Sequence, residues 1–188
     1  MANHETNLLE TLTEPTEEKH NKLIIDFMYI DLEVCSRCKG TEANLNKAIN
    51  EVTPMLNTVG YDILVNRVLV GSEEQAISLH FDLSPTIRIN GTDIQPASKE
   101  SNCGSCNTIT GIDVDCRVWV YKGKEYTEAP KGIIMDAILA EVYGQSSASN
   151  EGKGENFVLS GNLKNFFDQK EKQRSKDDNM CCSSDQCC

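Results

Sequence analysis

The 188-residue sequence contains no run of about 18 apolar residues, so no membrane-spanning helix is expected. Its first residues, Met1 to Glu5, lack the basic start and apolar stretch of a secretory signal. Basic residues are outnumbered by acidic ones, and the net charge of −11 argues against binding of nucleic-acid phosphates or anionic membranes as the main function. Neither a phosphate-binding glycine loop nor a dinucleotide fingerprint occurs, so no flavin or nicotinamide is expected. We expect a cytoplasmic protein with no nucleic-acid partner and no membrane partner.

Cysteine, in contrast, is abundant, with nine residues in the chain. Reducing conditions in the cytoplasm disfavour structural disulfides, so such cysteines are metal ligands, redox thiols or small buried side chains. Their grouping argues against simple core filling for most of them. The groups are Cys35 and Cys38, Cys103 and Cys106, the single Cys116, Cys181 and Cys182, and finally Cys187 and Cys188.

Hydrophobic patterning predicts an α/β fold with one central mixed sheet flanked by helices. Residues 92–115 show no period and are expected to be a cysteine-containing insertion. In chain order we expect a strand at 23–32, a helix at 38–52 ended by Pro54, a strand at 61–70, a helix from Ser72 that includes His80, strands at 86–89 and 116–121, and a helix from Pro130 to Gly144.

The composition divides the chain into three parts. Residues 1–21 form a polar N-terminal tail, and residues 22–144 form the folded domain. Residues 145–188 hold a Ser/Gly/Asn-rich linker, a short helix around Leu163, Phe166 and Phe167, and a charged, flexible tail that ends in four cysteines.

The first cysteine pair stands between a strand and a helix, in the segment Cys35-Ser36-Arg37-Cys38. Cys35 is expected at the helix N-terminus, where free amides and the helix dipole favour its thiolate. Two intervening residues let Cys38 reach back to close a disulfide, and Arg37 adds positive charge nearby. A zinc half-site is the alternative interpretation of the same spacing.

The strand, the dithiol, the helix and the later Ser84-Pro85-Thr86 before a strand resemble the thioredoxin-like superfamily over roughly residues 22–144. The resemblance implies that Cys35 is the attacking thiol, that Cys38 resolves the mixed disulfide, and that Pro85 is a cis proline that orients the partner chain. The Trp-Cys-Gly-Pro-Cys motif of thioredoxin itself is absent. The chain is also similar to a cysteine-rich thioredoxin-like group from anaerobic microbes.

The second pair, Cys103 and Cys106, has several interpretations. It can form a disulfide, act as a relay that reduces the first dithiol, join the first pair in a metal site, or brace its own loop as a disulfide or metal clip. The distance in sequence between the pairs is much longer than in zinc fingers. Cys116 opens a strand expected to be central, and we expect it to serve packing.

The last eight residues contain Cys181, Cys182, Cys187 and Cys188 among serine, aspartate and glutamine, which packing does not explain. Thiolates select soft ions, so this tail is a candidate site for Zn, Cu(I), As(III) or Hg(II). The alternative is a set of adventitious or regulatory thiols. As a flexible coil, residues 145–180 would span about 30 Å, so the tail thiols could also meet the dithiol.

Two functions follow from these patterns. The first is thiol–disulfide exchange with protein or small-molecule disulfides, an oxidoreductase activity of Cys35 and Cys38 that needs no cofactor. The second is non-enzymatic binding of a thiophilic metal or metalloid, for sequestration or delivery, by the terminal pairs Cys181/Cys182 and Cys187/Cys188, beside the two earlier pairs. The two functions are compatible, because a dithiol that exchanges disulfides also binds soft ions.

Overall fold

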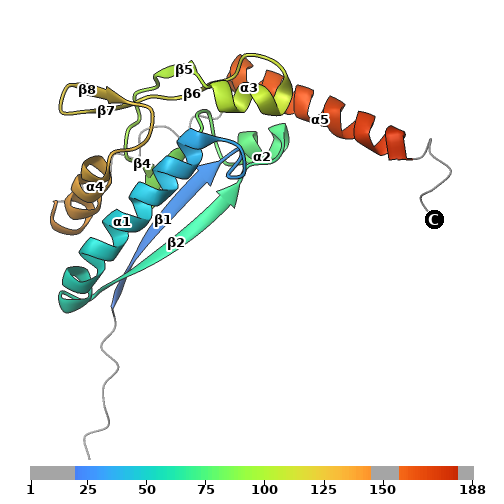
Figure 1. Ribbon diagram of the computed structural model, residues 1–188. Coiled ribbons are helices and arrows are strands. Elements are labelled where there is room, and N and C mark those ends of the chain that lie inside the picture. The colour runs from blue at the N-terminus through green and yellow to red at the C-terminus, as the bar shows by residue number, and fades with distance from the viewer. Residues whose placement is uncertain (1–19, 145–156, 182–188) are drawn as a thin grey trace, which may run out of the picture.

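The structure is a computed structural model that describes residues 20–144 and 157–181, the side chains of the latter segment as far as Ser175. Strands and helices alternate in its first half (Figure 1). The elements are β1 (Asn21–Tyr29), α1 (Ser36–Thr58), β2 (Tyr61–Leu69), α2 (Glu73–Ser78), β3 (Thr86–Ile89), β4 (Thr92–Asp93), β5 (Glu100–Asn102), α3 (Gly104–Thr110), β6 (Asp115–Arg117), β7 (Trp119–Tyr121), β8 (Lys124–Tyr126), α4 (Lys131–Tyr143) and α5 (Gly161–Cys181).

The central sheet is mixed and has the strand order β2-β1-β3-β4. β1 pairs with β2 in parallel, and the connection between them is α1, as the helical spacing between the two apolar strands predicted. β3 then pairs with β1 antiparallel, and the Asn90-Gly91 turn returns the chain into β4. The prediction of a central mixed sheet with flanking helices is confirmed.

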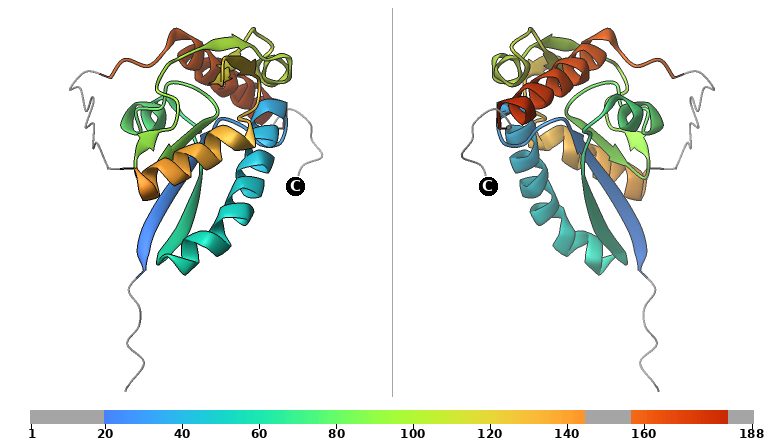
Figure 2. Two further views of the ribbon diagram at one scale, coloured as in Figure 1. Left: turned by 90° about the vertical axis from the view of Figure 1, so that its left-hand side faces the viewer. Right: turned by 90° about the vertical axis from the view of Figure 1, so that its right-hand side faces the viewer.

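The two faces of β1 enter different cores because side chains alternate along a strand. Leu23, Ile25 and Phe27 are buried with apolar residues of α1 and α4, which cover one face of the sheet. Met28 points to the other core, which also receives side chains from α2 and α5. Figure 2 shows α5 and α3 together at the end of the sheet where β1 leads into α1.

The segment between β4 and α4 forms small elements of its own. β5 pairs with β6, and β7 pairs with β8 around the Lys122-Gly123 turn, both in antiparallel two-stranded sheets. Helix α3 lies between β5 and β6 and ends at Gly111, whose φ of 72° is left-handed and suits glycine. We call residues 95–118, which include β5, α3 and β6, the cysteine insertion.

An ion pair joins this segment to the central sheet. Arg117 of β6 is almost fully buried and makes two hydrogen bonds with the Asp93 carboxylate of β4, at 2.9 and 2.6 Å. Its guanidinium also lies 5.0 Å from the ring centre of Trp119. A buried cation held in this way fixes where the chain leaves β6.

Several predicted boundaries are wrong. Helix α1 does not end before Pro54 but continues to Thr58, because Leu56 packs in the same core as Val52 and outweighs the bond that proline cannot make. His80 follows α2 instead of belonging to it, with a φ of 49°.

The expected central strand at 116–121 is also a wrong prediction. Val118 interrupts it, and the residues on either side pair in two separate small sheets, so Cys116 lies outside the central sheet. The C-terminal part differs too. The expected short helix is the beginning of α5, which continues through charged residues that we predicted to be flexible.

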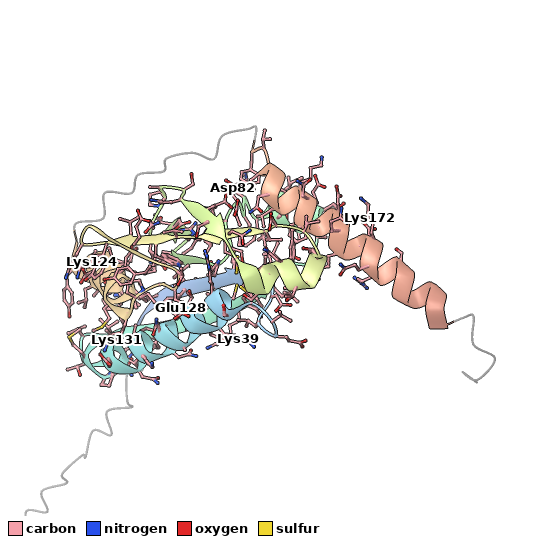
Figure 3. All side chains as sticks on the ribbon, turned by 45° about the horizontal axis from the view of Figure 1, so that its top comes forward. Lys39, Asp82, Lys124, Glu128, Lys131 and Lys172 are labelled. Carbon is pink, nitrogen blue, oxygen red and sulfur yellow. The ribbon has the colours of Figure 1, made fainter. Side chains whose placement is uncertain are left out.

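Ser160 precedes α5 and caps it, because its hydroxyl accepts a hydrogen bond from the Leu163 amide at 3.4 Å. The first turns of α5 are anchored in the core by Leu163, Phe166 and Phe167, which are all buried. The Asp82 carboxylate accepts a hydrogen bond from the Ser160 amide at 3.0 Å, and Figure 3 labels Asp82 beside the start of this helix and Lys172 farther along it. Leu163 and Phe166 supply the apolar contacts on which a helix in water depends. Within residues 20–144 and 157–181, each helix is too short or too polar to span a membrane.

Candidate metal centre

Four cysteine thiols converge where α1 begins. The Sγ atoms of Cys35, Cys103, Cys106 and Cys116 all lie within 4.8 Å of one another. Their side chains have exposures of 0%, 2%, 0% and 0% in that order, so the cluster is closed to bulk water. Among the described residues, these four and Cys38 are all free thiols.

Cys35 is the only member of the cluster that comes from the central α/β layer. It is the N-cap residue of α1, the place that the sequence predicted, and its Sγ accepts a hydrogen bond from the Cys38 amide at 3.4 Å. The Asp31 carboxylate accepts bonds from the Val34 and Cys35 amides at 2.5 and 3.2 Å and so fixes the loop before it. The helix dipole and this amide favour a thiolate at Cys35.

The other three thiols come from the cysteine insertion. Cys103 immediately precedes α3, Cys106 lies in the first turn of that helix, and Cys116 is the central residue of β6. The Cys103 amide donates to the Val114 carbonyl at 2.8 Å, which holds the start of α3 against the start of β6. The loop closed by this bond brings α3 and β6 together, so that the thiols of Cys103, Cys106 and Cys116 meet.

Arg37 fastens the insertion to α1. Its guanidinium donates to the carbonyl oxygens of Ser101, Asn102 and Cys116 at 3.2, 2.5 and 3.1 Å, and to the Ser101 hydroxyl at 3.0 Å. A planar guanidinium offers several donors in fixed directions, which suits a clamp across the two strands β5 and β6. The carbonyl of Cys116 is thus held by the residue two positions after Cys35.

Serine hydroxyls form a second connection between the two cysteine segments. Ser105 Oγ lies 3.1 Å from the Ser36 amide and 3.2 Å from the Ser36 hydroxyl. It also lies 3.3 Å from Cys103 Sγ. The two Cys-x-x-Cys segments therefore face each other directly.

Cys38 is buried beside the cluster but is not part of it. Its Sγ lies 3.6 Å from Ser84 Oγ, and Ser84 is joined to Pro85 by a cis peptide bond. Ser84 Oγ also accepts the Ile30 amide at 3.2 Å, which ties this corner to the strand before the dithiol. Pro85 is buried. The structure thus places Pro85 on the side of Cys38, while the insertion covers Cys35.

The five thiols do not share one protonation state. The pKa of Cys35 is lowered, because Cys103 first and then Cys106 and Cys116 offer hydrogen bonds to its sulfur. The pKa of Cys103 falls to about 6, chiefly through its hydrogen bond with Cys106. The pKa values of Cys106 and Cys116 are raised, each chiefly by its hydrogen bond with Cys103. The pKa of Cys38 is also raised, first by its hydrogen bond with Cys35 and then by burial.

A second apolar core surrounds the thiols. Phe166 of α5, Ile30 after β1 and Val114 before β6 are all fully buried in it together with the cysteines. An apolar wall of this kind lowers the local dielectric and shields the sulfurs from water.

The structure brings together residues that the sequence could only group in pairs. Cys103 and Cys106 lie against Cys35, an arrangement that the spacing left open. Cys116 is buried, as expected, but it also lines the thiol cluster, and neither this nor the clamp by Arg37 was predicted. Of the terminal cysteines, Cys181 is the last residue of α5, and Cys182, Cys187 and Cys188 lie outside the described residues.

The fold and the site define a cysteine-rich α/β protein with a buried cluster of four thiols. Residues 23–138 match the family described as Domain of unknown function (DUF2703), and the chain belongs to this family. The match extends from β1 into α4 and includes all four cysteines of the cluster. Comparisons with curated proteins and with solved structures gave no match.

Proposed function

We propose that the protein binds a thiophilic metal ion through Cys35, Cys103, Cys106 and Cys116. The observation that carries this proposal is the mutual approach of the four Sγ atoms to within 4.8 Å. A tetrahedral zinc site with Zn–S bonds of about 2.3 Å has sulfur–sulfur separations of about 3.8 Å. Adjustments of about 1 Å or less would convert the cluster into such a site.

Electrostatics supports an ion at this place. A thiolate that is removed from water needs a compensating charge, and the lowered pKa of Cys35 puts negative charge inside an apolar core. The cation of Arg37, two residues after Cys35, gives its donors to oxygen atoms of Ser101, Asn102 and Cys116. A divalent ion at the centre of the four sulfurs supplies the charge that the thiolates require.

Four thiolates at the corners of a tetrahedron favour Zn(II) or iron over harder ions. Zinc is our first choice, because it takes four thiolates without a preference imposed by d electrons. Cu(I), As(III) and Hg(II) are further candidates, each of which binds thiolates in smaller numbers. The terminal cysteines remain a second proposed binding set for such ions.

The role of the ion follows from where its ligands come from. One ligand is the N-cap residue of α1 and three belong to the cysteine insertion, so a bound ion would join the insertion to the central layer. A reducing compartment such as the cytoplasm would keep these thiols available. The site would then both hold the ion and fix the fold around it.

We also propose that the fold is a variant of the thioredoxin-like architecture. The parallel β1–α1–β2 unit, the antiparallel β3 and β4, the order β2-β1-β3-β4 and the position of Cys35 before α1 support this assignment. In this comparison the insertion covers the dithiol that such proteins leave open.

Thiol–disulfide exchange by Cys35 and Cys38 is the second candidate function. It is favoured by the Cys38 amide, which bonds to Cys35 Sγ, and by Ser84 and Pro85 beside Cys38. In this reaction Cys35 attacks a protein or small-molecule disulfide, Cys38 resolves it, and Pro85 orients the partner. The complete burial of Cys35 ranks this function second, because a partner chain reaches the sulfur only if the insertion opens.

The test is a metal count on reduced, anaerobically purified protein. We expect one zinc ion per chain in a full-length variant with Cys181, Cys182, Cys187 and Cys188 all changed to serine, called the tail-serine variant. The additional change Cys116→Ser should abolish this zinc, and Cys38→Ser should leave it. Elemental mass spectrometry gives the count, and circular dichroism checks that each variant is folded.

Cobalt supplies an independent readout, because tetrahedral Co(II)–thiolate centres have intense charge-transfer and visible bands. These bands should be present in the tail-serine variant and lost with Cys116→Ser. Equal zinc content with and without Cys116, or no thiolate bands with cobalt, would overturn the proposal.

A further inference from the structure

The buried fifth thiol, Cys38, has no place in a four-sulfur site. It is fully buried like the four ligands, yet it lies outside the group whose sulfurs are all within 4.8 Å of one another. Its position one helical turn after Cys35 calls for a chemical explanation.

The backbone holds Cys38 beside Cys35. Its amide donates to Cys35 Sγ at 3.4 Å. On its other side, the Ser84 hydroxyl lies 3.6 Å from Cys38 Sγ. The Cys35 sulfur therefore has two sets of neighbours, the three insertion thiols and the first turn of α1, which carries Cys38.

We propose that Cys38 is a redox switch for the metal centre, in which a Cys35–Cys38 disulfide formed by a hydroperoxide removes one ligand and releases the ion. This inference rests on the proposed function. Cys35 cannot be a thiolate ligand and part of a disulfide at the same time, so the metal-bound and the oxidised states exclude each other.

The chemistry is balanced with hydrogen peroxide as the oxidant. The Cys35 thiolate attacks one peroxide oxygen, the O–O bond breaks, and the products are Cys35 sulfenic acid and hydroxide. The Cys38 thiol then attacks the Cys35 sulfur, the S–O bond breaks, and water leaves with the proton of the thiol. Two electrons pass from the two cysteines to the peroxide, and the metal ion keeps its charge.

Burial decides which oxidant fits. Cys35 and Cys38 both have 0% exposure, so a folded protein partner cannot reach either sulfur directly. Hydrogen peroxide is small and uncharged and needs only a transient opening next to Ser36 and Gly104, which are exposed where the two cysteine segments meet. The switch would therefore respond to peroxide faster than to bulky disulfides.

Release of the ion follows from the geometry of the remaining ligands. The ion would keep the three sulfurs of Cys103, Cys106 and Cys116 but lose Cys35, the one ligand at the start of α1. The link through the ion between the insertion and α1 would then be broken. Reduction of the disulfide restores Cys35 and allows the ion to return, which makes the switch reversible.

The experiment uses the zinc-loaded tail-serine variant and the same protein with Cys38→Ser. Both are treated with hydrogen peroxide while a chromogenic chelator records free zinc, and mass spectrometry maps disulfides. We expect zinc release in step with a Cys35–Cys38 disulfide and recovery after dithiothreitol. With Cys38→Ser we expect release about tenfold slower, with Cys35 oxidised beyond the point that dithiothreitol reverses.

The outcomes separate the two proposals. If the tail-serine variant takes up no zinc in the reduced state, the proposed metal centre is wrong. If it takes up zinc but both proteins release it at the same rate and equally reversibly, or if the disulfide maps to Cys106–Cys116, the metal centre stands and the switch is refuted. Cys38→Ala serves as a second variant and should behave like Cys38→Ser.

Discussion

Cys106 Sγ and Cys116 Sγ lie 3.3 Å apart although they belong to different elements, helix α3 and strand β6. The antiparallel pairing of β5 with β6 returns the chain to this point, and the bond from the Cys103 amide to the Val114 carbonyl closes the loop. Three thiols are thus arranged by local contacts within the cysteine insertion. Only the fourth, Cys35, depends on how the insertion lies on α1.

The first prediction concerns this fourth thiol. Cys35→Ser in the tail-serine variant should lower zinc affinity at least about a hundredfold, because a hydroxyl does not replace the thiolate that joins the insertion to α1. Competition with a zinc chelator measures the affinity. Cys38→Ser is the matched control, since it removes a buried thiol from the same turn, and it should bind zinc as tightly as the parent. A parent-like affinity for Cys35→Ser would contradict the assignment.

The second prediction concerns Arg37 as a positioning residue. Arg37→Ala should weaken zinc binding about tenfold, because β5 and β6 lose the guanidinium that holds the carbonyls of Ser101, Asn102 and Cys116. Arg37→Lys should not restore the affinity, since one ammonium group cannot reach all of these oxygens.

Lys39→Ala is the control for Arg37, because it removes an exposed positive charge two residues further along the same helix (Figure 3). It should leave zinc affinity unchanged. An equal loss for both variants would mean that net charge, and not the clamp, determines the affinity. Hydrogen exchange of the β5 and β6 amides should rise only with Arg37→Ala.

The sequence predicts the central layer well, because its signals are local. The apolar strand at 23–32, the helix that follows and the strand at 86–89 each have their own sequence pattern, and β1, α1 and β3 form at these places. Pro54 shows the limit of local rules. Proline usually ends a helix, but the burial of Leu56 in the core keeps α1 continuous past Pro54.

The thiol cluster could be predicted only in part, because it depends on contacts between residues far apart in the sequence. Cys35 and Cys103 stand in recognisable Cys-x-x-Cys segments, yet nothing in either segment fixes the fold of the insertion. Cys116 has no partner at short spacing, and its strand signal merges with that of Trp119. Its place depends on the β5–β6 pairing and on the contacts of Arg37 and of the buried Arg117, which are interactions between distant residues.

The third prediction concerns pH. The pKa of Cys35 is lowered and that of Cys103 falls to about 6, so both are thiolates at neutral pH. The pKa values of Cys106 and Cys116 are raised, so these two thiols stay protonated. Zinc must displace about two protons, so its affinity should rise about a hundredfold per pH unit between pH 6 and the ordinary thiol pKa of 9.0.

Calorimetry in buffers of different ionisation enthalpy counts these protons. Below a pH of about 6, Cys103 is also protonated and the pH dependence should become steeper. A proton count near zero at neutral pH would show that the thiols are not the ligands. A count near four would show that Cys35 and Cys103 are not thiolates in the metal-free protein.

The fourth prediction concerns the cover that α5 forms. Phe166 is fully buried against the thiol core, so Phe166→Ala should destabilise the fold by about 3 kcal/mol and admit water to the site. Zinc should exchange faster with a chelator. Val158→Ala is the control, since this side chain is 82% exposed and contributes little to the core. Unchanged exchange in Phe166→Ala would mean that α5 does not seal the centre.

The fifth prediction concerns the buried ion pair that joins the insertion to the sheet. Asp93→Ala removes the carboxylate that holds Arg117, whose side chain has 3% exposure, and leaves a buried cation without its partner. The free energy of unfolding should fall by about 3 kcal/mol. The double change Asp93→Ala with Arg117→Met should be less destabilised than Asp93→Ala alone, because the unpaired charge is gone. Denaturant unfolding followed by the fluorescence of Trp119, the only tryptophan, measures both. If the double variant is the less stable one, Arg117 stabilises the fold even without Asp93, through its bonds to the Gln95 carbonyl and the Thr86 hydroxyl.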